Sequence, residues 1–306
     1  MQPATAMNGQ VTLTRPVRSS PLTLEMIHAK WAAVRASGET VGTTLHHACY
    51  YVLACFLGDP WLHDHVLVGC RYPGFLSMRP AMQGDGMGID KDHTLRAVQL
   101  AEVLFNLQEV PGLEHCLDRM FSGQIEPTMA ELDFGMFLHR QGVPFSYVAP
   151  SGVKTQDYDV DVPYEGGPVA CGDIKCKIEG SDYTEATVLN SLRKVRQQLP
   201  ADRPGIAFVK VPQDWVDAST GNLGVGESVT ETLAKFFGTT KRMVLVVFYT
   251  KLTFELPHGT AIRHVALERE NASSRYAGER SWRLFDEVRE PPEWVSFAQI
   301  MDGHHW

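Results

Sequence analysis

The sequence predicts an α/β fold with a mainly helical N-terminal region, and three observations predict it. Apolar residues recur at helical spacing from residue 21 to about residue 122. Short runs in which polar and apolar residues alternate begin soon afterwards, as half-buried strands require. Further helical stretches separate the later runs, which is typical of an α/β core. We expect a flexible arm at 1–20, a helical region at 21–125 and an α/β domain at 126–306.

The composition is that of an ordinary soluble protein. The 306 residues are 44% hydrophobic and carry 28 Lys and Arg against 36 Asp and Glu, a net charge of −8. This balance excludes collagen-like, disulfide-stapled and largely disordered chains, and it argues against broad coating of nucleic acid or anionic membranes. The sequence has no signal-peptide core and no run of 18 apolar residues, and its six cysteines are scattered. We therefore expect a cytoplasmic protein with reduced thiols and no membrane partner.

Apolar spacing predicts the elements of the N-terminal region. Helices are expected at 22–37, 43–57 and 93–109, and the last has the most regular apolar stripe. Gly and Pro at 58–60 and 111–112 interrupt the pattern, because these residues favour turns. The Gly-, Met- and Asp-rich stretch 78–92 is predicted to be a loop.

The second half of the chain alternates predicted helices and strands. Helices are expected at 127–141, 184–199 and 227–237. Strands are expected at 145–148, 158–162, 169–178, 205–211, 243–254 and 261–267. From 127 to 211 the order is helix, three strands, helix, strand.

Charged side chains gather on the predicted hairpin of strands 158–162 and 169–178. Alternation places on one face of the first strand Asp157, Asp159 and Asp161. It places on one face of the second strand Asp173, Lys175 and Lys177. The Gly- and Pro-rich segment 163–168 suits the turn between them, so the two charged faces are expected to meet.

The register of this hairpin decides which acid meets Asp173. A turn centred at Glu165 pairs Asp157 with Asp173, whereas a turn centred at Gly166 pairs Asp159 with it, and the sequence leaves both open. Either register brings two carboxylates and a lysine together. Neighbouring carboxylates are unfavourable unless a cation neutralises them, and oxygen ligands with open positions suit Mg²⁺.

Glu131 lies on the preceding predicted helix among apolar neighbours. The residues three, four and seven positions later are Phe134, Gly135 and Leu138. An acid on an apolar helical face should be buried, and a buried acid needs a partner. Gly135 would let that face approach the sheet closely. The partner is a metal site or, alternatively, a structural salt bridge.

These residues resemble the PD-(D/E)xK phosphodiesterases, a nuclease superfamily with the restriction-endonuclease-like fold. Its pattern is a helix with Glu, a strand with Asp and a hairpin to a (D/E)-x-K strand. The matching pieces here are Glu131, the run Asp157-Tyr158-Asp159, and Asp173-Ile174-Lys175. Gln156 stands where the family often has proline. The family's αβββαβ order is also similar to 127–211, so the resemblance implies a restriction-endonuclease-like core within 126–306.

The resemblance implies a nuclease that uses Mg²⁺ or Mn²⁺ to cleave nucleic acid, with DNA favoured over RNA and endo- or exonuclease action left open. The implied catalytic residues are Glu131, Asp159, Asp173 and Lys175. The implied metal ligands are Asp157 or Asp159, Asp173 and Glu131, with a main-chain carbonyl near Ile174. The metal would activate a water, and Lys175 would orient that water or stabilise the pentavalent state.

Basic and amide side chains near the motif are candidate substrate ligands. Lys177 shares the face of Lys175, and Lys194 and Gln197 share one face of the predicted helix 184–199. The segment 175–210 holds seven Lys and Arg against four Asp and Glu, so it is locally basic within an acidic chain. The alternative for these side chains is a solvent-facing surface.

Two other functions stay open at this point. A nuclease-like fold that has lost catalysis would act as a binding module for nucleic acid or protein. A zinc-dependent enzyme would instead use the N-terminal cluster of His46, His47, Cys49 and Cys55, although the paired CxxC spacing typical of zinc sites is missing. The sequence does not predict the oligomeric state.

Overall fold

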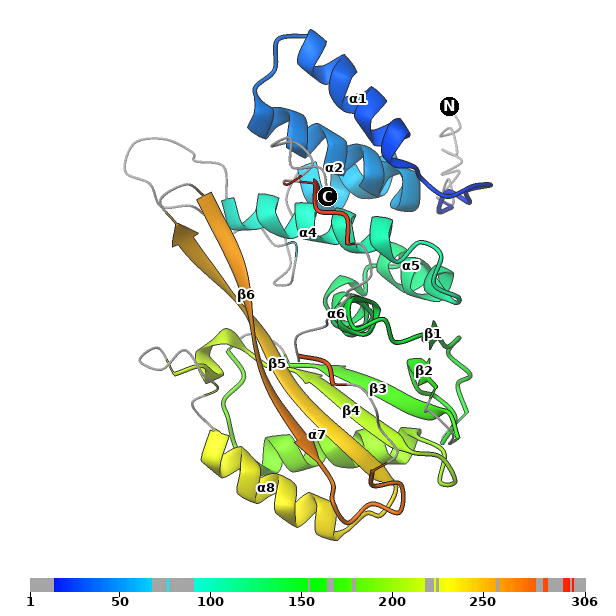
Figure 1. Ribbon diagram of the computed structural model, residues 1–306, viewed down its shortest axis with the longest axis vertical. Helices are drawn as coiled ribbons and strands as arrows, with labels where there is room; N and C mark the ends of the chain where they lie inside the picture. The colour runs from blue at the N-terminus through cyan, green and yellow to red at the C-terminus, as the bar shows by residue number, and fades with distance from the viewer. Residues whose placement is uncertain are drawn as a thin grey trace, which may run out of the picture.

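The chain folds as a stack of helices above a mixed sheet, with two more helices beneath the sheet (Figure 1). The computed structural model describes residues 14–67, 76, 91–153, 155–163, 168–177, 180–217, 223, 226–256, 259–278, 283–285, 294–297 and 299. Its sheet lies in the second half of the chain, as the sequence predicts.

Helices make up the described part of the N-terminal region. They are α1 (Leu24–Ala36), α2 (Val41–Leu57), α3 (Asp59–Leu62), the π-helical turn η1 (His63–Leu67), α4 (Lys91–Asn106) and α5 (Leu113–Phe121). The three helices predicted there are confirmed as α1, α2 and α4. The Thr23 side chain accepts a hydrogen bond from the Met26 N–H and so caps the start of α1. Residues 78–90 of the predicted loop lie outside the described residues. Its last two residues, Lys91 and Asp92, belong to α4 instead.

The described strands form one six-stranded sheet. After α6 (Ile125–Arg140) come β1 (Ser146–Tyr147), β2 (Val160–Val162), β3 (Ala170–Cys176), α7 (Glu185–Gln198), β4 (Gly205–Lys210), the 3₁₀ turn η2 (Gln213–Trp215), α8 (Gly226–Gly238), β5 (Met243–Leu256) and β6 (Gly259–Glu270). The strands pair in chain order, antiparallel from β1 to β3, parallel from β3 to β5 and antiparallel again at β6. α7 and α8 make the crossovers that parallel strands need, which confirms the α/β class.

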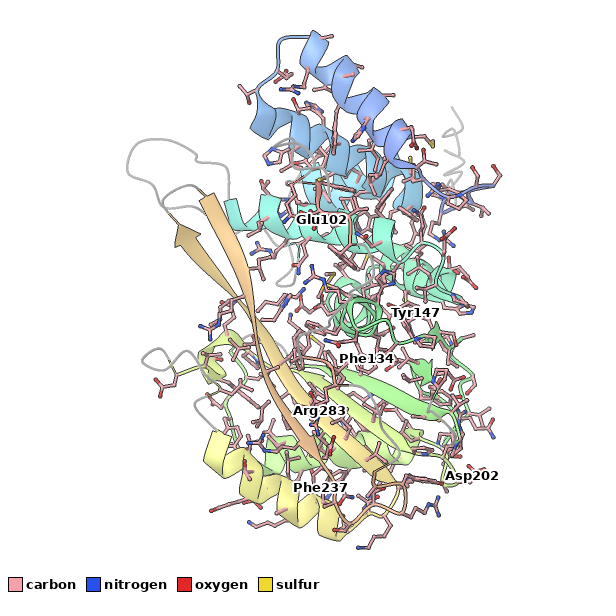
Figure 2. The ribbon with its side chains drawn as sticks, in the orientation of Figure 1. Glu102, Phe134, Tyr147, Asp202, Phe237 and Arg283 are labelled. Atoms are coloured by element: carbon pink, nitrogen blue, oxygen red, sulfur yellow. The ribbon has the colours of Figure 1, made fainter. Side chains whose placement is uncertain are left out.

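Apolar layers hold helices onto both faces of the sheet. α6 covers one face, where the rings of Phe134 and Phe208 lie 4.7 Å apart between centroids. α7 and α8 cover the other face, where Leu192 and Phe237 share a core with Ala207. Figure 2 shows Phe134 and Phe237 on opposite sides of the sheet. Burial of these side chains supplies most of the stabilisation that fixes the helices in place.

The helical region shares a core with α6 and the sheet. Buried apolar side chains of α2, α4 and α5 form one continuous cluster with those of α6 and β3 to β5. The tail also returns to this region. The Asn106 side chain of α4 donates to the Val295 carbonyl at 3.0 Å and accepts from its N–H at 2.8 Å. The Phe297 ring lies edge-on to the rings of Trp31 and Phe105.

The described part of the N-terminal arm lies along the same helices. Arg15 Nε is 2.8 Å from Asp118 Oδ1 of α5, and the Arg18 guanidinium lies 4.9 Å from the centre of the Phe56 ring in α2. The predicted arm before residue 14 lies outside the described residues. None of the described helices combines the length and apolar character needed to cross a membrane.

Candidate active site

The pairing of β2 with β3 places Asp159 beside Asp173. Val160 pairs with Gly172, and one residue earlier the Asp159 N–H donates to the Gly172 carbonyl at 2.9 Å. This is the register centred at Gly166, one of the two that the sequence allows.

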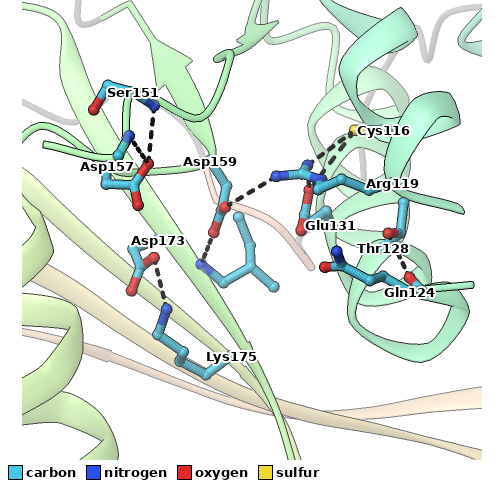
Figure 3. Close-up of polar contacts among 12 residues, drawn as sticks. Cys116, Arg119, Gln124, Thr128, Glu131, Ser151, Asp157, Asp159, Asp173 and Lys175 are labelled. Carbon is cyan, nitrogen blue, oxygen red and sulfur yellow. Dashed lines mark hydrogen bonds and ion pairs between the residues drawn. The ribbon is translucent and has the colours of Figure 1, made fainter. Parts of the chain in front are cut away.

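The Asp159 side chain turns back onto β3. Its Oδ2 accepts a hydrogen bond from the backbone N–H of Ile174 at 2.6 Å (Figure 3). Strand β2 begins only at Val160, so this carboxylate takes the place that a carbonyl of a longer strand would occupy. The hydrogen bond therefore fixes a carboxylate at the edge of β3.

Asp173 is buried and is paired with a lysine of its own strand. Its side chain is 1% exposed, and Lys175 Nζ donates to its Oδ1 at 2.9 Å (Figure 3). Its Oδ2 is buried and has no hydrogen-bond partner among the described residues. An unsatisfied buried carboxylate oxygen is costly, so this atom is suited to a further cation or donor.

Glu131 approaches the same edge from α6 and is buried, as the sequence predicts. Its Oε2 accepts a hydrogen bond from Arg119 Nη2 and lies 3.7 Å from the Cys116 Sγ. Nη1 of the same guanidinium lies 3.9 Å from Asp159 Oδ1 (Figure 3). Arg119 therefore lies between two acids, one from α6 and one at the start of β2.

Sequence reasoning missed Arg119 and Cys116 because it assigned no helix to α5. A signal for this helix was present. Leu113, Cys116, Leu117 and Met120 have the spacing of one apolar helical face, and all four are buried. That spacing would have placed Arg119 on a helix, but its contact with Glu131 depends on how α5 packs against α6.

Close packing at Gly135 brings α6 near β1, as predicted. A methyl group at this position would overlap the Tyr147 hydroxyl and come within 3.0 Å of Phe145 Cε2. The absence of a side chain therefore lets α6, and with it Glu131, lie close to the edge of the sheet.

Acids at this edge hold their protons more tightly than usual. Burial and the Asp159 charge raise the pKa of Glu131 from 4.5 to about 8, although Arg119 acts to lower it. Burial and the Asp159 charge also raise the pKa of Asp173 well above its usual range, against the effect of Lys175. Burial raises the pKa of Asp159, against the hydrogen bond from the Ile174 N–H. Further positive charge is needed before all three acids can ionise together.

The donor chemistry fits a divalent cation, but the side chains do not form a gathered cluster. Asp159 and Asp173 offer hard oxygen ligands, and Asp173 Oδ2 is the atom that such a cation would satisfy. Among the described residues, no three His, Cys, Asp or Glu side chains are grouped closely enough to hold a metal ion. Glu131 comes from α6 on one side of the sheet, whereas Asp173 alternates with the core residue Ile174 and so faces the α7 side.

Asp157 is not brought to this edge. Its Oδ1 accepts hydrogen bonds from the N–H groups of Ser151 at 3.0 Å and Gly152 at 3.4 Å, so it braces the loop before β2 (Figure 3). Asp161 pairs instead with Arg203. Asp159 is therefore the acid of this run that lies beside Asp173.

Among the predicted substrate ligands, the structure brings two lysines together. Lys177 Nζ lies 3.5 Å from the Thr187 carbonyl of α7. Burial and the nearby positive charge of Lys194 lower the pKa of Lys177, as expected for two neighbouring ammonium groups. Lys194 and Gln197 are both exposed on α7.

The N-terminal His and Cys residues are spread around α2. Cys49 is fully buried, and burial raises its pKa, whereas His47 is exposed. The His46 ring stacks on Tyr50, with 6.3 Å between centroids. Zinc needs several such ligands around one point, and the part of the chain that the structure describes contains no such group.

No family model, curated protein or solved structure matches the chain, so a functional proposal rests on the site itself.

Proposed function

We propose that the protein is a Mg²⁺-dependent phosphodiesterase of the PD-(D/E)xK type that cleaves nucleic acid, with DNA favoured over RNA. The observation that carries this proposal is the juxtaposition of Asp159 and Asp173, with Lys175 two residues further along β3. Two acids and a lysine in this order are the groups that the sequence resemblance implies.

The order of elements supports a restriction-endonuclease-like core. α6, β1, β2, β3, α7 and β4 follow one another in the αβββαβ order of the resemblance. β4 pairs in parallel with β3 after the α7 crossover, and the candidate acids lie where β2 meets β3. Glu131 comes from the first helix of this set, where the resemblance expects it.

In this proposal each side chain has a definite role. Asp159 and Asp173 would hold Mg²⁺ or Mn²⁺, which supplies a water of lowered pKa and neutralises charge on the phosphate. Lys175, released from Asp173, would orient the attacking water or donate to a phosphate oxygen. Lys177 and Lys194 would contact a neighbouring phosphate from the α7 side.

The test is cleavage of labelled double-stranded DNA, single-stranded DNA and RNA by the full chain with Mg²⁺ or Mn²⁺. Asp173→Asn and Lys175→Gln are expected to slow cleavage by about 100-fold or more, because each removes a group that acts on the phosphate or the water. Asp157→Asn is the matched control, since Asn can still accept the loop hydrogen bonds, and it should keep wild-type activity. Absence of cleavage with either metal, or equal activity of wild type and Asp173→Asn, would refute the proposal.

A second candidate is a nuclease-like fold that binds a partner without metal. The contacts of Arg119 with Glu131 and Asp159, and of Lys175 with Asp173, favour it, because these cations already compensate the acids. For this candidate, DNA or RNA binding measured by fluorescence anisotropy should be as strong in EDTA as in Mg²⁺. A requirement for Mg²⁺ would argue against it.

A further inference from the structure

The Arg119 side chain of α5 places a positive charge at the candidate site. Its guanidinium contacts Glu131 through Nη2 and lies 3.9 Å from Asp159 Oδ1 through Nη1. The side chain is 18% exposed, and Nη2 also lies 3.6 Å from the Cys116 Sγ. A partly buried cation thus lies directly beside one of the two acids proposed to hold the metal.

Burial explains why a cation is needed at this position. Glu131 is buried, and it can ionise there only beside a positive charge, because an unpaired ionised carboxylate inside a protein is very costly. Arg119 supplies that charge from α5, across the contact between α5 and α6. The same guanidinium also reaches Asp159, so one group partly neutralises both acids.

We propose that Arg119 competes with the divalent cation for the Asp159 carboxylate, so that α5 sets the metal affinity of the site. This inference rests on the proposed function, because it takes Asp159 as a metal ligand. Arg119 is here a positioning residue that holds Glu131 and Asp159 in place. A guanidinium and a divalent cation that share one carboxylate repel each other, enough to weaken metal binding about tenfold even with the screening of bulk water.

The test is Mn²⁺ binding to the full chain without nucleic acid, measured by calorimetry and by the electron paramagnetic resonance signal of free Mn²⁺. Arg119→Gln is expected to bind Mn²⁺ about tenfold more tightly than wild type. Arg203→Gln is the matched control, because Arg203 pairs in the same way with Asp161, two residues along β2 from Asp159. Its Mn²⁺ affinity should equal that of wild type.

A second pair of variants covers the case in which Arg119→Gln does not fold. The double variant Arg119→Gln with Glu131→Gln removes both charges of the pair, so neither partner is left buried without the other. It should bind Mn²⁺ more tightly than Glu131→Gln alone. Equal or weaker binding in these comparisons would overturn the inference. Failure of both wild type and Arg119→Gln to bind Mn²⁺ would also overturn it, because removal of the competing charge should expose the site.

Cleavage assays separate this inference from the proposed function. If wild type cuts no nucleic acid but Arg119→Gln binds Mn²⁺ more tightly, the nuclease proposal fails and the competition stands. If wild type cuts DNA but Arg119→Gln shows no gain in Mn²⁺ affinity, only the competition fails.

Discussion

The Asp159 carboxylate accepts a hydrogen bond from the Ile174 N–H, with 2.6 Å between Oδ2 and the nitrogen. A side chain here replaces a strand carbonyl at the point where β2 gives way to the preceding loop. This contact therefore contributes both to the local pairing of the sheet and to the position of a candidate metal ligand.

Substitutions of Asp159 should separate its hydrogen bond from its charge. Asp159→Asn keeps an acceptor and removes repulsion from Asp173, so we expect it to be as stable as wild type or more stable at pH 8. Asp159→Ala leaves the Ile174 N–H without its partner and should lower the free energy of unfolding by about 1–3 kcal/mol. Urea denaturation measures both. Equal losses in the two variants would show that the charge itself is needed for folding.

The stability of the metal-free protein should fall as Glu131 ionises. Its pKa is about 8 in the folded protein against an ordinary value of 4.5, so the folded state binds more protons between these values. The contribution of this group to the free energy of unfolding is therefore complete below pH 4.5 and is lost as the pH rises to 8, with a slope of up to about 1.4 kcal/mol per pH unit.

The control for this pH dependence is Glu131→Gln, which cannot ionise. His264 acts in the opposite direction, because burial lowers its pKa to about 3 and its protonation favours unfolding at low pH. The prediction therefore concerns the difference between the two proteins in denaturation series from pH 5 to 8.5. Parallel curves over that range would show that Glu131 does not hold its proton in the folded state.

Gly135→Ala should destabilise the contact between α6 and β1. The added methyl group meets the buried Tyr147 hydroxyl, and overpacking of this kind costs about 1–3 kcal/mol. Because that hydroxyl has no partner among the described residues, Tyr147→Phe in the Gly135→Ala background should recover part of the loss. Thermal and urea unfolding of the single and double variants measure this coupling, and strictly additive effects would contradict it.

A buried ion pair between α6 and β5 should be costly to break from one side. Lys251 Nζ lies 2.5 Å from Asp133 Oδ1, and the Tyr249 hydroxyl donates to Asp133 Oδ2. Lys251→Met should lower the free energy of unfolding by about 3–5 kcal/mol, because it leaves a buried acid without its cation. Adding Asp133→Leu should restore much of that stability. A double variant no more stable than Lys251→Met would indicate that the polar cluster specifies the packing of α6.

The sequence was sufficient to predict the elements around the site because their patterns are local. Alternation at 158–162 and 169–178 predicts β2 and β3, and helical spacing predicts α6 and α7. Their ends differ by a few residues from the prediction, since hydrogen bonding between strands decides where each one ends. The choice between Asp157 and Asp159 depends on the turn register, which alternation alone does not determine.

The charge partners of the site could not be predicted in the same way. Lys175 is two residues from Asp173, so strand geometry places the two on one face. Arg119 is twelve residues before Glu131 on a different helix, and only the packing of α5 against α6 joins them. The raised pKa values of Glu131, Asp159 and Asp173 likewise depend on burial. The spacing of apolar residues in the sequence predicts burial only in part.

Residues 294–297 pack against α4, so the strands of the sheet lie in sequence between two segments that belong to the helical layer. Val295 is 189 positions from Asn106, and the Phe297 ring completes the packing around Trp31. During synthesis this layer stays incomplete until residues 294–297 emerge, and such distant contacts slow folding. Cleavage between residues 125 and 126 would divide the core that the helical region shares with α6 and the sheet. Neither fragment would then contain the whole core, and we expect the two fragments to regain structure only when mixed.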